Sequence, residues 1–126
     1  MSVAYVDSSC VVAIAFGERG AAAIGRRLAR FDELVSSNLL ESEVRAAAAR
    51  EGVRGEIPLL AALTWALPDR PIGAEIARAL AAGYVRGADC WHLATALYVA
   101  SDPTEMTFLT LDARQATVAA ALGFRI

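Results

Sequence analysis

The stretch VAYVDSS, residues Val3–Ser9, decides the fold of this chain because an apolar, partly β-branched run stops abruptly at a carboxylate and two hydroxyls. A run this apolar predicts a strand that is buried on both faces, as the central strands of parallel sheets are. Its last residue, Asp7, would then lie at the carboxyl edge of the sheet, where open α/β folds bind their ligands.

The same pattern returns near the end of the chain, where the apolar run Met106–Leu111 leads directly into Asp112. Two buried strands are therefore expected to deliver one Asp each to the same edge of the sheet.

Strand-like runs alternate with helix-like segments along the sequence, which predicts a three-layer α/β/α sandwich with a central, mainly parallel sheet. A chain of 126 residues is expected to form one domain, 1–126, and to bury about two thirds of its unfolded surface. In the helix after Pro71, Ile76 and Leu80 are expected to face inward. The predicted strands lie near residues 3–6, 31–36, 64–67, 106–111 and 124–126, and the predicted helices near residues 8–16, 21–30, 39–51, 59–63, 72–82, 89–101 and 113–122.

Composition narrows the possible partners. The formal net charge of −2 predicts neither a nucleic-acid partner nor a membrane, yet all 12 basic residues are Arg. Arg binds phosphate through paired hydrogen bonds, although a GC-rich coding sequence would also give an Arg-only chain. The 56% hydrophobic content predicts that another chain covers part of the surface.

Neither a membrane span nor a signal peptide is indicated, because no apolar run approaches the roughly 20 residues that a span needs. We therefore expect a cytoplasmic protein. Cys10 and Cys90 have no metal-site spacing and are expected to be buried free thiols.

The helix near residues 39–51 carries an acidic residue on its apolar face. Asn38 is a good N-cap and Glu41 occupies the position that completes a capping box, but Glu43 shares the stripe of Leu40 and Ala47. A carboxylate facing the core costs several kcal/mol unless a partner meets it. The partner could be a cation in a binding site or, alternatively, an ion pair with an Arg such as Arg45 or Arg50.

Asp89 is a fourth carboxylate of this kind, one helical turn before Leu93 on the same stripe. It could also serve the helix N-terminus electrostatically, just as Asp7 and Asp112 could cap the helices that follow them. Four carboxylates in one pocket would repel one another, and a hard divalent cation such as Mg²⁺ or Mn²⁺ would remove that penalty. Such a site suits phosphodiester hydrolysis. The four candidate ligands are Asp7, Glu43, Asp89 and Asp112.

These residues stand in segments that together resemble the PIN-domain ribonucleases, specifically the VapC toxins of type II toxin–antitoxin pairs. The resemblance covers essentially the whole chain and rests on four motifs in order: VAYVDSS with Asp7, SNLLESE with Ser37 and Glu43, ADCWHLATAL with Asp89, and TLD with Asp112. The resemblance implies that these four acidic residues are the metal ligands, because they match the positions of the metal-binding acids in the family. Ser8 and Thr110 match positions where hydroxyl residues support the site.

The resemblance implies a Mg²⁺- or Mn²⁺-dependent endoribonuclease toxin, usually a homodimer, that cuts tRNA or rRNA and is blocked by a cognate antitoxin. No acidic residue follows Asp112 within four positions, so whether one metal or two bind stays open. His92 could be a general acid, but a lone His is more often a hydrogen-bonded packing residue. The RNA contacts are unplaced, with Arg19, Arg45, Arg86 and Arg114 as candidates.

Other functions fit less well. A phosphoacceptor signalling domain would need a Lys, which the chain lacks, and a haloacid-dehalogenase-like phosphatase would need an acid where Ser9 stands. A PIN-like binding module or scaffold that has lost catalysis remains the alternative, because a fold by itself does not establish activity.

Overall fold

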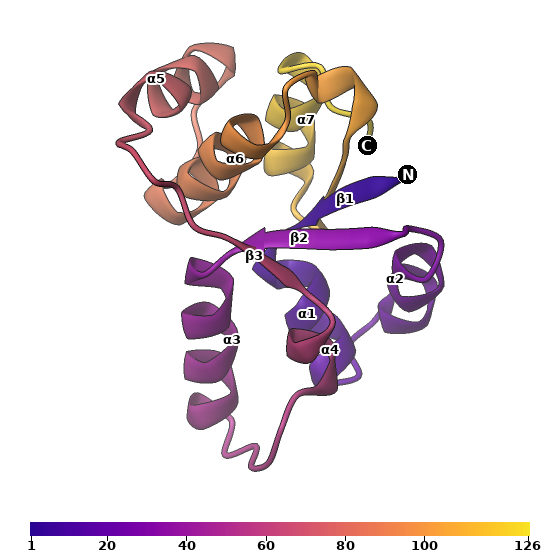
Figure 1. Cartoon of the computed structure of the whole chain (residues 1–126). Coiled ribbons are helices and arrows are strands. Elements are labelled where there is room, and N and C mark those ends of the chain that lie inside the picture. The colour runs from indigo at the N-terminus through magenta and orange to yellow at the C-terminus, as the bar shows by residue number, and fades with distance from the viewer.

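A computed structural model describes all residues, 1–126, and its centre is a four-stranded, all-parallel sheet with strand order β3-β2-β1-β4. Figure 1 shows the helices arranged on both faces of this sheet, which confirms the three-layer α/β/α prediction. The strands are β1 (Val3–Val6), β2 (Glu33–Ser37), β3 (Thr64–Ala66) and β4 (Thr107–Leu109).

The register brings the carboxyl ends of β1 and β4 together. Tyr5 is paired with Val35 on one side and with Phe108 on the other. The pairing continues one residue beyond β1, since the Asp7 N–H donates to the Leu109 carbonyl at 3.1 Å. The predicted last strand is reduced to a single parallel bridge between Thr107 and Arg125.

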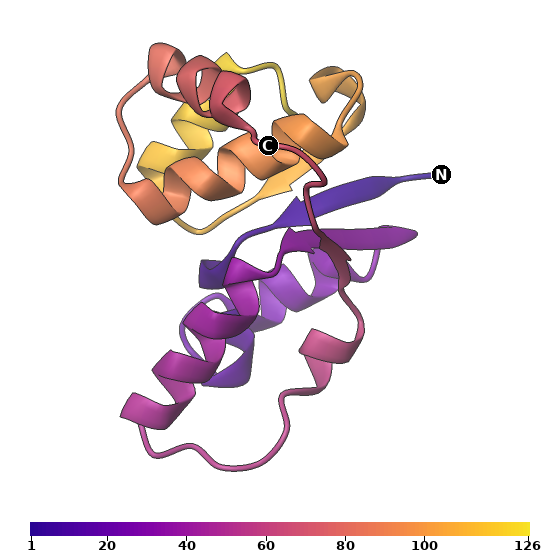
Figure 2. The same ribbon diagram turned by 60° about the vertical axis from the view of Figure 1, so that its left-hand side comes forward.

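Alternation along β1 divides the core in two, because successive side chains of a strand point to opposite faces. Ala4 and Val6 pack with helices α1 to α4, whereas Tyr5 packs with α5 to α7. Figure 2 shows the two helical layers separated by the sheet. The helices are α1 (Ser8–Ala15), α2 (Ala21–Leu28), α3 (Leu39–Arg50), α4 (Pro58–Ala61), α5 (Gly73–Ala82), α6 (Gly87–Val99) and α7 (Ala113–Ala121), with a 3₁₀ turn η1 (Pro103–Glu105).

Two local predictions are wrong. Leu80 does not face inward: it is 44% exposed, and Ala79 is buried in its place, so the helix is rotated by about one residue from the expected phase. The capping box at α3 does not form either. Asn38 makes no side-chain capping bond, and Glu41 pairs instead with Arg45 at 2.7 Å.

No helix combines the length and the apolar character that crossing a membrane would require.

Candidate active site

Asp7 lies where β1 ends and α1 begins, and its side chain is only 2% exposed. The Ser9 hydroxyl donates to Asp7 Oδ1 and the Thr110 hydroxyl donates to Asp7 Oδ2, each at 2.6 Å. Burial raises the pKa of Asp7 above its ordinary value, and these two hydrogen bonds oppose the rise. Ser9, rather than the predicted Ser8, therefore supports this carboxylate together with Thr110.

The loop after β4 fixes the direction of these hydroxyl groups. The N–H of Leu111 donates to Ser9 Oγ at 2.9 Å, and the N–H of Asp112 donates to Thr110 Oγ1 at 3.0 Å. Because each hydroxyl oxygen already accepts a backbone hydrogen, its own proton is free to bond to Asp7.

Asp112 caps α7, since its carboxylate accepts from the Gln115 N–H at 2.8 Å. The fully buried Gln115 side chain then connects three segments: its carbonyl oxygen lies 3.1 Å from Thr110 Oγ1, and its amide donates to the Asp89 carbonyl at 3.3 Å. Hydrogen bonds from Thr110 to Asp7, from Asp112 to Thr110 and from Gln115 to both Asp112 and the Asp89 backbone carbonyl thus tie the end of β1, the first turn of α6 and the start of α7 together.

Asp89 stands in the first turn of α6 and is partly buried. Burial raises its pKa, and the nearby carboxylates of Asp112, Asp7 and, more weakly, Glu43 raise it further. Asp89 and Asp112 both line a cavity of about 410 Å³ whose other walls are Tyr84, Arg86 and Arg114.

Glu43, on α3, faces His92 on α6, with 2.7 Å between Glu43 Oε1 and His92 Nε2. The other ring nitrogen, His92 Nδ1, lies 2.7 Å from the Tyr5 hydroxyl. The Arg alternative for Glu43 is wrong, because Arg45 pairs with Glu41 and Arg50 with Glu51. His92 is 1% exposed and both its nitrogens are engaged, so its surroundings are those of a hydrogen-bonded packing residue rather than of a general acid open to substrate.

The structure thus brings the four predicted acids together unequally. Asp89 and Asp112 share the wall of one cavity, Asp7 is connected to both through Thr110 and Gln115, and Glu43 has His92 as its partner. As the side chains stand, no group of three His, Cys, Asp or Glu residues could hold one metal ion. The chemistry of the donors nevertheless fits Mg²⁺ or Mn²⁺, because Mg²⁺ keeps several waters and needs only one or two carboxylates directly. The four-carboxylate site therefore stays a prediction.

Sequence reasoning missed Gln115, which is the side chain that links Asp89 to Thr110. A signal for it exists in the sequence: Asp112-Ala113-Arg114-Gln115 has the spacing of a capping box, with a polar side chain three residues after the cap. In the structure this side chain reaches into the core instead of back to the cap.

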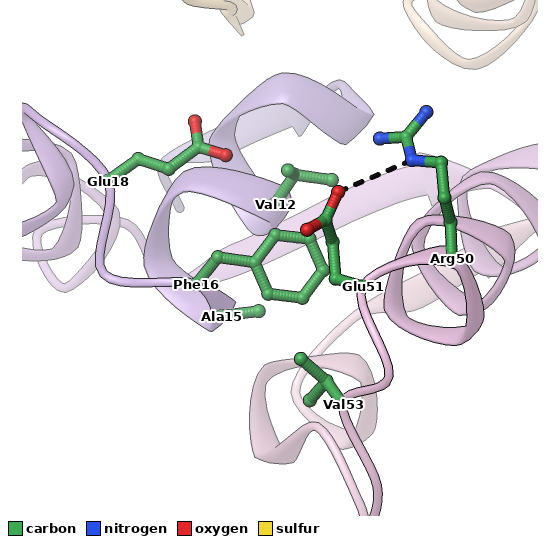
Figure 3. A pocket seen from close by; sticks show the side chains of 7 residues that line it. All are labelled: Val12, Ala15, Phe16, Glu18, Arg50, Glu51 and Val53. Carbon is green, nitrogen blue, oxygen red and sulfur yellow. Dashed lines mark ion pairs between the residues drawn. The ribbon is translucent and has the colours of Figure 1, made fainter.

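A second cavity, of about 550 Å³, lies away from these carboxylates (Figure 3). It sits between the C-terminal ends of α1 and α3, with Phe16 and Val12 on one side and the Arg50–Glu51 ion pair, 3.4 Å long, on the other. Since α1 extends about 12 Å from Asp7 to this end, the cavity has no part in the carboxylate site.

Comparison with known proteins gives one match. The family model of the PIN domain matches residues 4–121, which include all four candidate acids. No curated protein and no solved structure matches the sequence.

Proposed function

Because the chain belongs to the PIN domain family, whose members are generally Mg²⁺-dependent nucleases, we propose that it is a metal-dependent endoribonuclease and the toxin of a toxin–antitoxin pair. The observation that carries this proposal is the meeting of Asp7, Asp89 and Asp112 at the carboxyl edge of β1 and β4, joined by Thr110 and Gln115. These hydrogen bonds hold the carboxylates of Asp7 and Asp112 and the backbone of Asp89 in place before any ligand binds.

In this proposal Asp7, Glu43, Asp89 and Asp112 hold Mg²⁺ or Mn²⁺. Burial raises the pKa of both Asp7 and Asp89, and neighbouring carboxylates raise the pKa of Asp89 further; a divalent cation would offset the cost of keeping these groups ionised, which supports the proposal. When bound, the cation supplies activation of water and neutralisation of charge at the phosphate. The chain itself supplies the ligands and fixes their orientation.

Two Arg residues that line the cavity beside Asp89 and Asp112 support a polyanionic substrate. Arg86 precedes α6 and Arg114 stands in the first turn of α7, and both line the cavity with Asp89 and Asp112. Neither takes part in an ion pair within the chain, in contrast to Arg45. We propose that they bind the phosphates of RNA beside the scissile bond and that Tyr84, which is 71% exposed, stacks on a base.

We further propose that the RNA belongs to the tRNA or rRNA class, that the active form is a homodimer, and that a cognate antitoxin blocks the site. The toxin assignment is supported by the motifs described above. Covering of the surface by another chain is supported by exposed apolar residues on the α5 and α6 side, where Leu80 and Tyr84 line a mostly apolar cavity with Trp91.

The decisive experiment compares the purified wild type with Asp89→Asn on total RNA, with Mn²⁺ and with a chelator. We expect Mn²⁺-dependent cleavage by the wild type only, and growth arrest on induction of the wild type but not of Asp89→Asn. Equal RNA patterns in all four reactions would favour the alternative, a PIN-like binding module or scaffold without catalysis.

A further inference from the structure

His92 is the only histidine of the chain and is almost completely buried, 1% exposed, between Tyr5 of β1 and Glu43 of α3. Both of its ring nitrogens have one partner, each at 2.7 Å. A neutral imidazole carries one proton, on either Nδ1 or Nε2, and this tautomer determines whether His92 donates a hydrogen bond to Tyr5 or to Glu43.

The hydrogen bonds of Tyr5 settle that choice. The backbone N–H of Ser37 donates to the Tyr5 hydroxyl oxygen at 3.1 Å, so this oxygen acts as an acceptor there. The phenolic proton then bonds to His92 Nδ1 at 2.7 Å, since the Ser36 hydroxyl, which also lies near Tyr5, gives its own proton to the Val6 carbonyl. A proton on Nδ1 would leave the buried Tyr5 hydroxyl proton without an acceptor, which costs about 1 to 3 kcal/mol.

It follows that Nδ1 is an acceptor and that the ring proton sits on Nε2, from which it is donated to Glu43 Oε1. The three hydrogen bonds therefore form one chain of donors: Ser37 donates to Tyr5, Tyr5 donates to His92, and His92 donates to Glu43.

Packing holds the members of this chain in place. The Tyr5 ring stacks on Phe108 with ring centroids 5.2 Å apart and meets the His92 ring edge-on at 5.8 Å. The Ser37 hydroxyl accepts from the Leu39 N–H at 3.0 Å and from Trp91 Nε1 at 2.9 Å, which ties the end of β2 to the starts of α3 and α6.

We propose that His92, with its single proton held on Nε2 by Tyr5, is the positioning residue that aims Glu43 at the metal site. This inference rests on the proposed function for the role of Glu43 as a ligand. The Glu43 carboxylate is held by this one directed hydrogen bond, and partners of metal ligands of this kind typically contribute 10- to 100-fold to metal affinity.

The first test reads the proton directly. Because His92 is the only histidine, a long-range ¹H–¹⁵N correlation spectrum of ¹⁵N-labelled protein contains one imidazole. We expect a single neutral tautomer with the proton on Nε2 in the wild type, and loss of this single state in Tyr5→Phe. A proton on Nδ1 in the wild type would overturn the proposal without any variant.

The second test separates the two bonds of His92 by side-chain length. His92→Asn places an amide near the former Nδ1, within reach of Tyr5 only, whereas His92→Gln places one near the former Nε2, within reach of Glu43. We expect Mn²⁺ affinity, measured by titration calorimetry, to fall about 10-fold in His92→Asn and His92→Leu and to stay close to the wild type in His92→Gln. Thermal unfolding of each variant reports its folding.

Equal Mn²⁺ affinity in His92→Leu and the wild type, with Glu43→Gln weakened, would overturn the positioning role. Failure of the proposed function looks different. A wild type that binds Mn²⁺ and shows the Nε2 tautomer, but cuts no RNA, would contradict the nuclease assignment while supporting the role of His92.

Discussion

The hydroxyl of Thr110 donates a hydrogen bond of 2.6 Å to the carboxylate of Asp7, joining the ends of two neighbouring parallel strands. Replacing Thr110 by Val keeps the shape of the side chain and removes the donor. We expect the free energy of unfolding to fall by about 1 to 3 kcal/mol, because a buried acceptor loses its partner. Urea denaturation measures this change. Thr110→Ser keeps the hydroxyl and serves as the matched control, so equal stabilities of the Val and Ser variants would contradict the prediction.

The raised pKa of Asp7 predicts how stability depends on pH without divalent ions. The folded protein binds this proton more tightly than the unfolded chain, whose Asp pKa is near 3.8. The favourable contribution is therefore complete at acid pH and is lost as the pH rises from that value through the folded-state pKa. Asp7→Asn does not titrate. We expect its stability relative to the wild type to increase with rising pH through this window.

Urea denaturation of both proteins in chelator, at several values from about pH 4 to about pH 8, tests this sign. The difference between the two proteins cancels Asp32 and Asp102, whose pKa values are lowered and which act in the opposite direction, while the part of the raised pKa of Asp89 that Asp7 causes acts in the same direction as Asp7 itself. A difference that is constant across the range, or that shrinks as the pH rises, would show that burial does not penalise the ionised Asp7.

Asp112 allows its structural and its proposed catalytic roles to be separated. Its carboxylate accepts the Gln115 N–H and so caps α7. Asn is an equally good cap, so Asp112→Asn should keep the wild-type stability, whereas Asp112→Ala should lose about 1 kcal/mol. Both variants lack the charge, and we expect both to lose Mn²⁺-dependent RNA cleavage. Retained cleavage in a stable Asp112→Asn protein would exclude this residue from metal binding.

The parts of the fold that the sequence predicts are those set by local patterns. Apolar runs of a few residues followed by an Asp are sufficient to locate β1 and β4, although β4 ends at Leu109, three residues before Asp112, and not at Leu111 as predicted. Parallel pairing of these two strands places Asp7 and the segment that leads to Asp112 at the same edge. Predictions of which of two adjacent residues faces a given side are wrong, because they depend on the exact rotation of the helix. Ser9 rather than Ser8 bonds to Asp7, and Ala79 rather than Leu80 is buried.

Partner choice over long separations is also beyond local patterns. Glu43 and His92 are 49 positions apart, and nothing in either segment indicates that α3 and α6 would place them in contact. The nearby Arg45 and Arg50, two and seven positions after Glu43, were the local alternatives for its partner, but Arg45 pairs with Glu41 and Arg50 with Glu51. The buried Gln115 was missed for a related reason, because the Asp89 carbonyl to which its amide donates is 26 positions away and is brought to it by the packing of α6.

The cavity at the start of α6 and α7 predicts which residues bind RNA. Each Arg that contacts a phosphate of single-stranded RNA should contribute about 0.7 to the slope of log affinity against log salt. We therefore expect Arg86→Ala and Arg114→Ala each to lower this slope by about that amount, and Tyr84→Ala to weaken binding by about 1 to 3 kcal/mol with the slope unchanged. Fluorescence anisotropy with a labelled single-stranded RNA in chelator measures binding without cleavage. Arg30→Ala is the control, because Arg30 lies between α2 and β2, at the opposite edge of the sheet. Slopes of the Arg86 and Arg114 variants that match this control would place the RNA elsewhere on the surface.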